Sequence, residues 1–489
     1  MNRLRYIKKP GRLKNGIIFL ATICYLLVSL VFVSKQDYFI CLLAPALLLL
    51  LLALVSIDNF FLLLLLLTPL SVQLRFLYPD LSVDLFLPTE PMLALLLIIV
   101  SYKLFVAGEG DRNFLKKPLT ILIGISLGWM FLTSFTGSDI LVSLKYSLAR
   151  LWFISAFYLL SYELFRKAGF MEKSFKFLVA GMIPVIVYHL VRLGAAGLFN
   201  RQAAHSSTWP FFNDHTSFGA AVAFLLPLVI YFICSSRKAV WKLLYLSVLI
   251  IFIAGLVFSY SRAAWLSLAV AILFSLVYLL KIPMKLAGAG LIVIIAAGIL
   301  SWSSIITGLK SNTQDSSANM LEHLNSISNI SSDNSNLERI NRWKCALRMM
   351  AEKPLLGTGP GTYQFEYAPY QLSHERSGIS TNFGDGGNAH SEYLGAMSDS
   401  GIPAGLFYIL ILIMAFRAGH RAWKESPGLQ TRFLSLALMA GLMTYVVHGG
   451  LNNFLDTDKI SAPFWMFLSA LLSLHPAKNK ELLSRRPEL

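Results

Sequence analysis

Long runs of apolar residues recur along the chain, and they constrain its fold more than any other feature. Each run has about 17–20 residues, enough as a helix to cross the roughly 30 Å of hydrocarbon in a bilayer. Of the 489 residues, 56% are hydrophobic and only 14% are charged, whereas an average soluble domain has about 25% charged residues. The sequence therefore predicts an all-α polytopic membrane protein.

The runs predict about fourteen spans, so we expect about 12–14 transmembrane helices. The spans lie near residues 16–34, 38–57, 60–77, 91–107, 118–135, 151–165, 177–193, 217–235, 243–260, 263–280, 286–304, 402–418, 431–448 and 461–475. Residues 1–304 then hold helices 1–11, residues 305–400 form a helical loop domain, and residues 401–489 hold the last helices and a tail. The first run lacks a small-residue cleavage site, which favours a membrane helix over a signal peptide.

The positions of the basic residues predict the orientation in the membrane. The chain has 42 Lys and Arg against 26 Asp and Glu, a net charge of +16. With a cytoplasmic N-terminus, every second connection is cytoplasmic, and these segments hold most of the basic residues, as the positive-inside rule expects. Both termini are then cytoplasmic and the 305–400 loop faces the outer side. The charge reports orientation, which argues against nucleic-acid binding.

Some arginines stand on the outer side, where this rule does not explain them. Arg150 occurs in KYSLARLW and Arg262 in FSYSRAAW, each at the outer end of a predicted span. A charge there is costly unless it is paired or faces a wet cavity, so both are functional candidates. Snorkelling to lipid headgroups is the structural alternative.

The outer loop contains an amphipathic helix followed by a glycine-rich turn. In NLERINRWKCALRMMAEKP, apolar residues recur at helical spacing up to Pro354, which ends the helix. Its other face presents Arg339 and Arg342, which suit either anionic headgroups or a bound phosphate. The segment LLGTGPGTYQFEY then predicts a tight turn leading to Tyr363.

The stretch GGNAHSEYLGAMSDSGIPAG, residues 386–405, carries a candidate catalytic base. We expect Asn388 to cap a short helix that ends at Gly401, with His390 in its first turn beside Glu392. The positive end of the helix dipole disfavours protonation, which leaves a neutral imidazole able to accept a proton near pH 7. A purely structural histidine is the alternative.

Two further polar segments lie on the predicted outer side. PFFNDHTSFGAA places Asn213 and His215 at a span entrance, either as part of a helix cap or as contacts for a glycan. NNFLDTDKIS contains Asp456 and Asp458, a weak DxD pattern for a divalent metal. The four cysteines fit neither a disulfide framework nor a zinc site, and we expect no metal and no cofactor.

Taken together, these motifs resemble the bacterial O-antigen ligase/polymerase superfamily. HSEYLGAMSDSGIPAG is similar to the family signature, with His390, Leu394 and Gly401 matching, Ser391 in place of the usual Asn, and Asp399 in place of the usual Glu. ERINRWKCALRMMAEKPLLGTGPGTY, SRAAW and NDHTSFGAAVAFLLPL resemble three further motifs of the family. The resemblance covers roughly residues 200–460, with the motifs in the family's order.

The resemblance implies inverting, metal-independent transfer of a glycan from undecaprenyl diphosphate to an acceptor. This takes place at the periplasmic face of the bacterial inner membrane, in lipopolysaccharide biosynthesis. It implies that His390 is the base and that Arg262, with Arg339 or Arg342, binds the diphosphate. We expect further substrate contacts from Arg150, Asn213, His215, Asn388, Glu392 and Tyr363.

The acceptor class stays open at this point. An O-antigen ligase transferring the glycan to lipid A–core is favoured over a polymerase that extends the glycan itself. The expected partners are the lipid-linked donor, lipid A–core or a growing glycan, and membrane lipids, with no nucleic acid. A transporter of lipid-linked sugars is a third alternative, although the spans contain few of the ionisable residues that transport requires.

Overall fold

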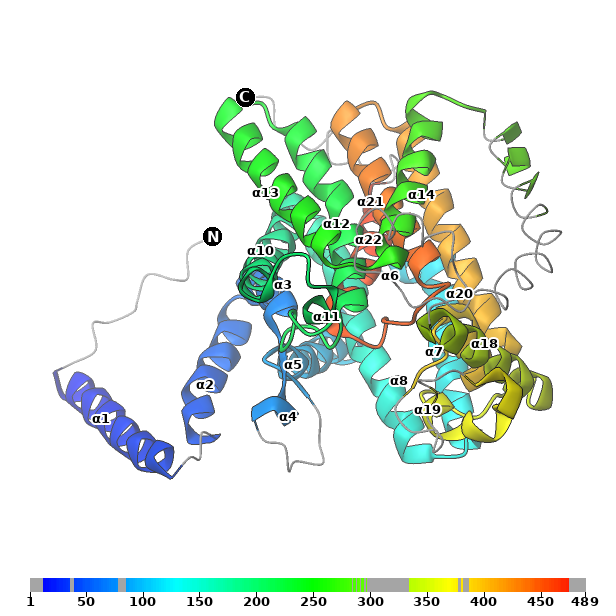
Figure 1. The fold of residues 1–489 in the computed structure, drawn as a ribbon. Helices are drawn as coiled ribbons and strands as arrows, with labels where there is room; N and C mark the ends of the chain where they lie inside the picture. Colours follow the sequence, from blue (N-terminus) through cyan, green and yellow to red (C-terminus); the bar gives the residue numbers. More distant parts are fainter. Residues whose placement is uncertain are drawn as a thin grey trace. The chain divides into compact units, whose positions relative to one another are not determined.

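The computed structural model describes residues 12–35, 39–77, 85–283, 334–376, 380 and 387–474, with a few positions between 285 and 296. These residues are almost entirely helical (Figure 1). In the described part of the chain, the one sheet has two short antiparallel strands, in which β1 (Val72–Gln73) pairs with β2 (Phe86–Leu87).

The helices follow one another in a simple order. The first group is α1 (Arg12–Ser34), α2 (Phe39–Val55), α3 (Ile57–Leu67), α4 (Leu74–Leu77), α5 (Thr89–Ser101), α6 (Arg112–Leu115), α7 (Pro118–Thr136), α8 (Ile140–Ile154), α9 (Ser161–Phe165) and α10 (Phe170–Ala196). The second group is α11 (Arg201–Ala204), α12 (His215–Ser235), α13 (Ala239–Phe258), α14 (Arg262–Leu279), α18 (Asn334–Glu352), α19 (Tyr363–Glu366), α20 (Glu392–Glu425), α21 (Leu429–His448) and α22 (Asp458–Ser473). π-Helical turns at Tyr102–Val106 and Ser155–Leu160 extend α5 and join α8 to α9.

Nine helices in the described residues are long and apolar enough to cross a membrane. Many of their outward side chains are large and apolar, such as Phe105 (85% exposed) and Leu141 (80% exposed). Such side chains are stable against lipid and costly against water. The predicted all-α polytopic membrane fold is therefore confirmed. The total of about 12–14 transmembrane helices and the cytoplasmic location of both termini stay predictions.

Two predicted spans are wrong in their bounds. The span at 60–77 does not form, because α3 ends at Leu67, a 3₁₀ turn at Thr68–Leu70 contains Pro69, and the chain then enters β1. The span expected at 151–165 is longer, since its helix begins at Ile140 after the Asp139 carboxylate accepts the N–H of Val142 at 3.0 Å. Arg150 thus lies well inside a helix and not at its end. The span predicted at 286–304 falls mostly outside the described residues.

The chain divides into two compact units, residues 1–63 and 64–489. The first contains α1, α2 and the start of α3, and its outward face is rich in exposed leucine, for example Leu30 and Leu54. The second contains the remaining helices and the candidate site. At its centre, the strongly buried α12 packs against α13, α14 and α21.

A close approach between α12 and α14 fixes the position of Arg262. A Cβ on Gly219 would lie 2.8 Å from the Cβ of Ser261 and 3.2 Å from that of Ala264. Glycine therefore lets the start of α14 pack directly against the first turns of α12. This packing brings Arg262, the first residue of α14, next to the N-terminal end of α12.

The segment 334–376 packs against the first part of α20. Figure 1 shows α18 and α19 beside the first part of α20, with which both are in contact. α20 spans 34 residues and is broken at Ser400 and Gly401, where φ at Gly401 is +78°. The amphipathic helix and the break at Gly401 were both predicted. The loop domain at 305–400 stays a prediction, since residues 301–333 lie outside the described part.

Candidate functional site

His390 lies in the turn just before α20, not in the first turn of a helix as predicted. The cap of α20 is Ser391, whose Oγ accepts the N–H of Leu394 at 3.4 Å. His390 has a φ of +49°, a left-handed conformation that a non-glycine residue adopts only when its surroundings hold it. The dipole argument for a neutral His390 therefore does not apply as stated.

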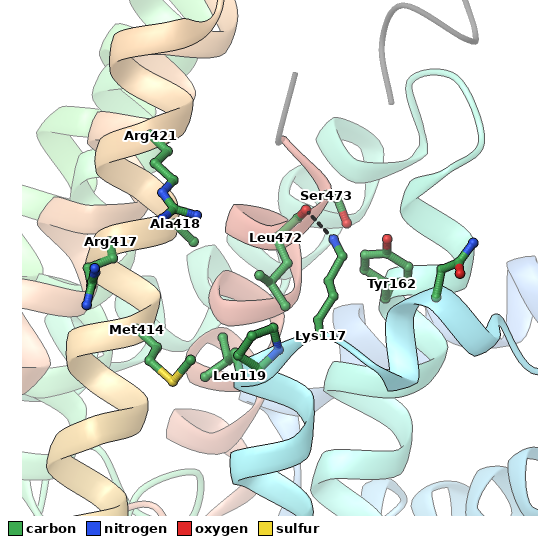
Figure 2. Close-up of a pocket in the computed structure, with 11 residues that line it drawn as sticks. Lys117, Leu119, Tyr162, Met414, Arg417, Ala418, Arg421, Leu472 and Ser473 are labelled. Carbon is green, nitrogen blue, oxygen red and sulfur yellow. Dashed lines mark hydrogen bonds between the residues drawn. The ribbon is translucent and has the colours of Figure 1, made fainter. Parts of the chain in front are cut away.

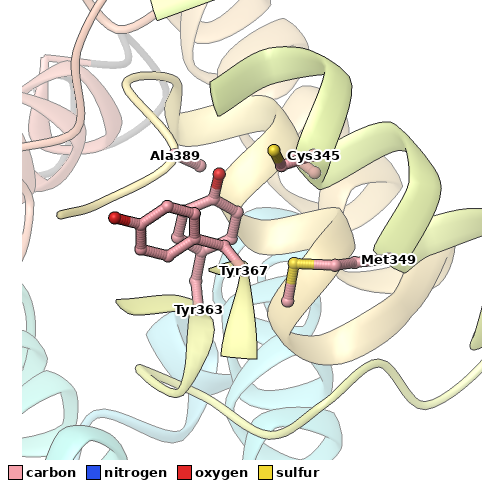
Figure 3. Close-up of a cluster of buried hydrophobic side chains, with 6 residues drawn as sticks. Cys345, Met349, Tyr363, Tyr367 and Ala389 are labelled. Carbon is pink, nitrogen blue, oxygen red and sulfur yellow. The ribbon is translucent and has the colours of Figure 1, made fainter. Parts of the chain in front are cut away.

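Contacts from both sides hold this turn. The indole N–H of Trp343 on α18 donates to the His390 carbonyl at 3.0 Å, and the Asn388 side-chain oxygen accepts the His390 N–H at 3.1 Å. Asn388 thus supports the turn and does not cap the helix. Its neighbour Ala389 is buried in a small cluster of apolar side chains with α18 and α19 (Figure 3).

That cluster attaches the turn to the rest of the loop. The rings of Tyr363 and Tyr367 stack with their centroids 5.4 Å apart and lie against Cys345 and Met349 of α18. The Tyr363 hydroxyl donates to the Arg342 carbonyl at 2.8 Å. Tyr363 was predicted to contact substrate. Its side chain is instead buried, with the residue 3% exposed, and its hydroxyl binds the backbone of α18.

Burial and nearby arginines keep the His390 imidazole neutral. Burial lowers the pKa of His390, the charges of Arg339 and Arg342 lower it further, and a hydrogen bond with the Asn452 side chain acts in the opposite direction. The resulting pKa is about 4, against an ordinary value of about 6.5. At neutral pH the imidazole is a proton acceptor, which is the state predicted from the sequence although its cause differs.

Three arginines from three parts of the chain form a cluster, which Arg339 connects to the His390 imidazole. Arg262 of α14 feels the charges of Arg201, the first residue of α11, and of Arg339 on α18. Burial lowers the pKa of Arg339, while the carboxylate of Asp214 raises it. Guanidinium groups assembled in this way, despite mutual repulsion, form an arrangement that suits a multiply charged anion such as a diphosphate.

Arg342 is held differently from Arg339. Its Nε donates to Glu338 at 2.7 Å, and its guanidinium carbon lies 3.7 Å from the centre of the Tyr367 ring. The side chains of Arg342 and Glu338 are 6% and 7% exposed, respectively. Of the two arginines that the resemblance offered as diphosphate ligands, Arg339 therefore belongs to the cluster with Arg262, whereas Arg342 is fixed in the packing of the loop, from where its charge still reaches His390.

Two imidazoles lie in the same region, His215 at the start of α12 and His205 directly after α11. The rings of His215 and His205 lie 4.1 Å apart, and Asp214 caps the helix by accepting the N–H groups of Thr216 and Ser217, each at 2.7 Å. His215 is thus close to the arginine cluster, and the charge of Arg339 reaches it. Asn213 is exposed at the surface before the cap.

Arg150 and Glu392 lie together in the interior of the protein. Arg150 donates to the Leu455 carbonyl at 2.8 Å and to the Tyr146 hydroxyl at 3.0 Å. Glu392 accepts the N–H groups of Phe454 at 2.7 Å and Leu455 at 2.9 Å, and also the Tyr445 hydroxyl. Both line a cavity of about 90 Å³ between α7, α8 and α20. These protein partners indicate that both residues hold the turn after α21.

The glycine-rich turn encloses Asp399. The N–H groups of Gly361 and Tyr363 donate to its carboxylate at 2.9 and 3.0 Å. Gly357, Gly359 and Gly361 all have positive φ, as a tight turn of this kind requires. The predicted turn is confirmed. Its backbone N–H groups bind the side chain of Asp399, a group of the protein itself.

The two aspartates of the DxD pattern have unlike environments. Asp458 is fully buried and accepts hydrogen bonds from Thr89 at 2.6 Å and Ser71 at 2.7 Å, with Lys459 3.3 Å away. Asp456 is exposed. In the described residues no group of three or more His, Cys, Asp or Glu side chains is arranged to hold a metal ion.

Sequence reasoning missed four members of the site. Arg201 was one of several unexplained basic residues on the outer side, while His205, His448 and Asn452 drew no attention. The Asn452 amide contacts His448 Nε2 at 3.2 Å and also bonds the His390 side chain. An outer arginine four residues before a histidine, in NRQAAH, was the signal available for Arg201.

Comparison with known proteins gives one match. Residues 247–409 match the family model described as O-antigen ligase, a range that includes Arg262, Arg339, Arg342 and His390. No curated protein matches the chain. The family supports a membrane glycosyltransferase of the ligase or polymerase type that acts on lipid-linked glycans. The apolar helices of the described residues make the chain a multi-pass membrane protein, and its residues 247–409 are similar to the O-antigen ligase family.

Proposed function

We propose that this protein is an O-antigen ligase. It transfers a glycan from undecaprenyl diphosphate to lipid A–core at the periplasmic face of the inner membrane, with inversion and without a metal. The observation that carries the proposal is the neutral His390 next to Arg339, whose charge also reaches Arg262 in a cluster with Arg201. This arrangement combines a base with a binding site for an anionic leaving group.

The reaction needs one proton transfer and one displacement. An acceptor hydroxyl attacks the anomeric carbon, its proton passes to the His390 imidazole, and the bond from that carbon to the diphosphate oxygen breaks. The electron pair leaves with the diphosphate, so a single displacement inverts the anomeric centre. A positioned base of this kind contributes about 10²–10⁴-fold to the rate.

The arginines act on the leaving group. Negative charge grows on the diphosphate as the bond breaks, and preorganised guanidinium groups stabilise it most where little water competes. Arg262 and Arg339 supply the positive charge, and Arg201 adds to it. The same region is bordered by His205 after α11 and by His215 and Asn213 at the entrance of α12, which provide polar contacts for the sugar or the acceptor.

The polymerase is the second candidate function, because it uses the same donor and the same displacement. The match of the His390 segment to the ligase signature favours the ligase. The two activities differ in their acceptor: a ligase requires lipid A–core, and a polymerase needs only the donor.

The test uses purified protein, a labelled undecaprenyl diphosphate-linked glycan, and lipid A–core added or omitted. His390→Asn removes the base and suits the left-handed backbone, which asparagine tolerates. We expect a shifted product that requires lipid A–core, and a loss of about 10²–10⁴-fold in the variant. His374→Asn is the matched control, since His374 is exposed in the same loop.

Two results would contradict the proposal. A ladder formed from the donor alone would assign the polymerase activity. Activity of His390→Asn within tenfold of the unmodified protein would remove His390 as the base.

A further inference from the structure

A second cavity lies at the other end of the helix that begins at the candidate site. It has a volume of about 520 Å³ and lies between the C-terminal half of α20, the start of α7, α9 and the end of α22 (Figure 2). Its apolar wall includes Leu119, Met414 and Leu472. None of the motifs assigned to glycosyl transfer reaches it.

Helix geometry gives the depth of this cavity. From the break at Gly401 to Arg421, α20 rises roughly 30 Å at 1.5 Å per residue, about the thickness of the hydrocarbon core of a bilayer. α7 begins at Pro118 and α22 ends at Ser473, both on the cavity. The cavity therefore opens at headgroup depth on the side of the membrane opposite His390, which the basic residues predict to be cytoplasmic.

The polar lining of the cavity is cationic. Figure 2 shows Lys117 on one wall and Arg417 and Arg421 on the opposite wall. Lys117 donates to the Leu472 carbonyl at 3.0 Å and lies 5.0 Å from the centre of the Tyr162 ring. Both arginines are exposed, and no carboxylate is among the described residues that line the cavity.

We propose that this cavity binds an anionic phospholipid of the diphosphatidylglycerol class. Basic pockets between membrane helices on the cytoplasmic side suit such headgroups. Cations on two facing walls match a headgroup with two phosphates, and arginine forks bind phosphate oxygens in pairs. The apolar wall between them accommodates the start of an acyl chain.

The bound lipid joins helices that carry the transfer site at their other ends. α7 and α20 both border the cavity, and at the outer end the Trp129 indole of α7 donates to the Ser400 carbonyl of α20 at 2.8 Å. A lipid held between the same helices stabilises their packing at the inner end. This inference concerns lipid binding, so it stands or falls independently of the transfer reaction.

The experiment measures lipid binding to the full-length protein in detergent by native mass spectrometry, with no sugar donor present. The probes are diphosphatidylglycerol, phosphatidylglycerol, phosphatidylethanolamine and undecaprenyl phosphate. The test variant is Arg417→Gln with Arg421→Gln. The control is Lys238→Gln with Lys424→Gln, which removes two exposed charges at the same end of the helices but outside the cavity.

We expect the unmodified protein and the control to prefer diphosphatidylglycerol, and the test variant to bind it about 30-fold more weakly. Each basic residue near a lipid headgroup contributes about fivefold. Equal weakening in both variants, or equal binding of all four lipids, would overturn the proposal. Crosslinks from residues 475–489 to Arg421 in the presence of saturating lipid would assign the cavity to the chain's own C-terminal segment.

Discussion

Replacing Glu392 by Ala should destabilise the protein and displace the hydrogen-bond partner of His390, the proposed base. The Glu392 carboxylate accepts the N–H groups of Phe454 and Leu455 and the Tyr445 hydroxyl, while Arg150 holds the Leu455 carbonyl. The same turn contains Asn452, which bonds the His390 side chain. Glu392 is therefore a positioning residue for the site.

The magnitude follows from the groups that lose their partner. Each buried donor left without an acceptor costs about 1–3 kcal/mol. Two backbone N–H groups cannot turn away, whereas the tyrosine hydroxyl can partly relax. We expect a loss of about 3 kcal/mol in the free energy of unfolding for Glu392→Ala, and about 1 kcal/mol for Glu392→Gln, which keeps one accepting oxygen.

Equilibrium unfolding in mixed micelles, followed by tryptophan fluorescence, measures the stability, and the transfer assay measures kcat and KM. A positioning role predicts lower stability and a lower kcat, both partly restored in Glu392→Gln. The sequence-based expectation of a direct substrate contact predicts a raised KM with unchanged stability. That second pattern would refute the reasoning from the hydrogen bonds.

Two other predictions test the base and the break in α20. Because the pKa of His390 is about 4, the imidazole is unprotonated above that pH, so kcat/KM should stay nearly constant from pH 8 down to about pH 5 and fall only below it. An activity decline centred near pH 6.5 would mean that burial and the arginines do not act on His390 as argued. Gly401→Ala should lower stability by about 3 kcal/mol, because a Cβ there would lie 1.9 Å from the Leu355 carbonyl oxygen at a φ of +78°. Gly128→Ala in α7, where a Cβ meets nothing within 4 Å, should change it by less than about 1 kcal/mol when both are compared in the same micelles.

Hydrophobic length was enough to predict most of the membrane helices. The spans at 118–135, 217–235 and 431–448 agree with α7, α12 and α21 within two residues at each end. Hydrophobicity averaged over a long stretch did not locate the helix ends that single residues determine. Pro69 and the short strand end one apolar run early, and the serines and Lys145 at the start of α8 conceal a helix that Asp139 caps.

The sequence identified many residues of the candidate site, but it did not predict how they are arranged in space. The segment with His390 was correctly identified, but its conformation depends on Trp343, which is 47 residues away in the sequence. Arg201 and Asn452 enter through loops whose positions depend on tertiary packing. Arg339 and Arg342 are indistinguishable by spacing, and they differ only in their tertiary contacts, such as the pairing of Arg342 with Glu338.

The turn around Asp399 has a consequence for how members of such a family can diverge. Backbone groups make most of the junction between this turn and α20: Gly359 donates to the Asp399 carbonyl at 2.7 Å, Thr358 to the Ser398 carbonyl at 3.1 Å, and Ile402 to the Pro354 carbonyl at 2.8 Å. Hydrogen bonds between backbone groups do not depend on the identity of most side chains. Neighbouring loop side chains are thus free to vary during evolution while the backbone that positions His390, the proposed base, is preserved.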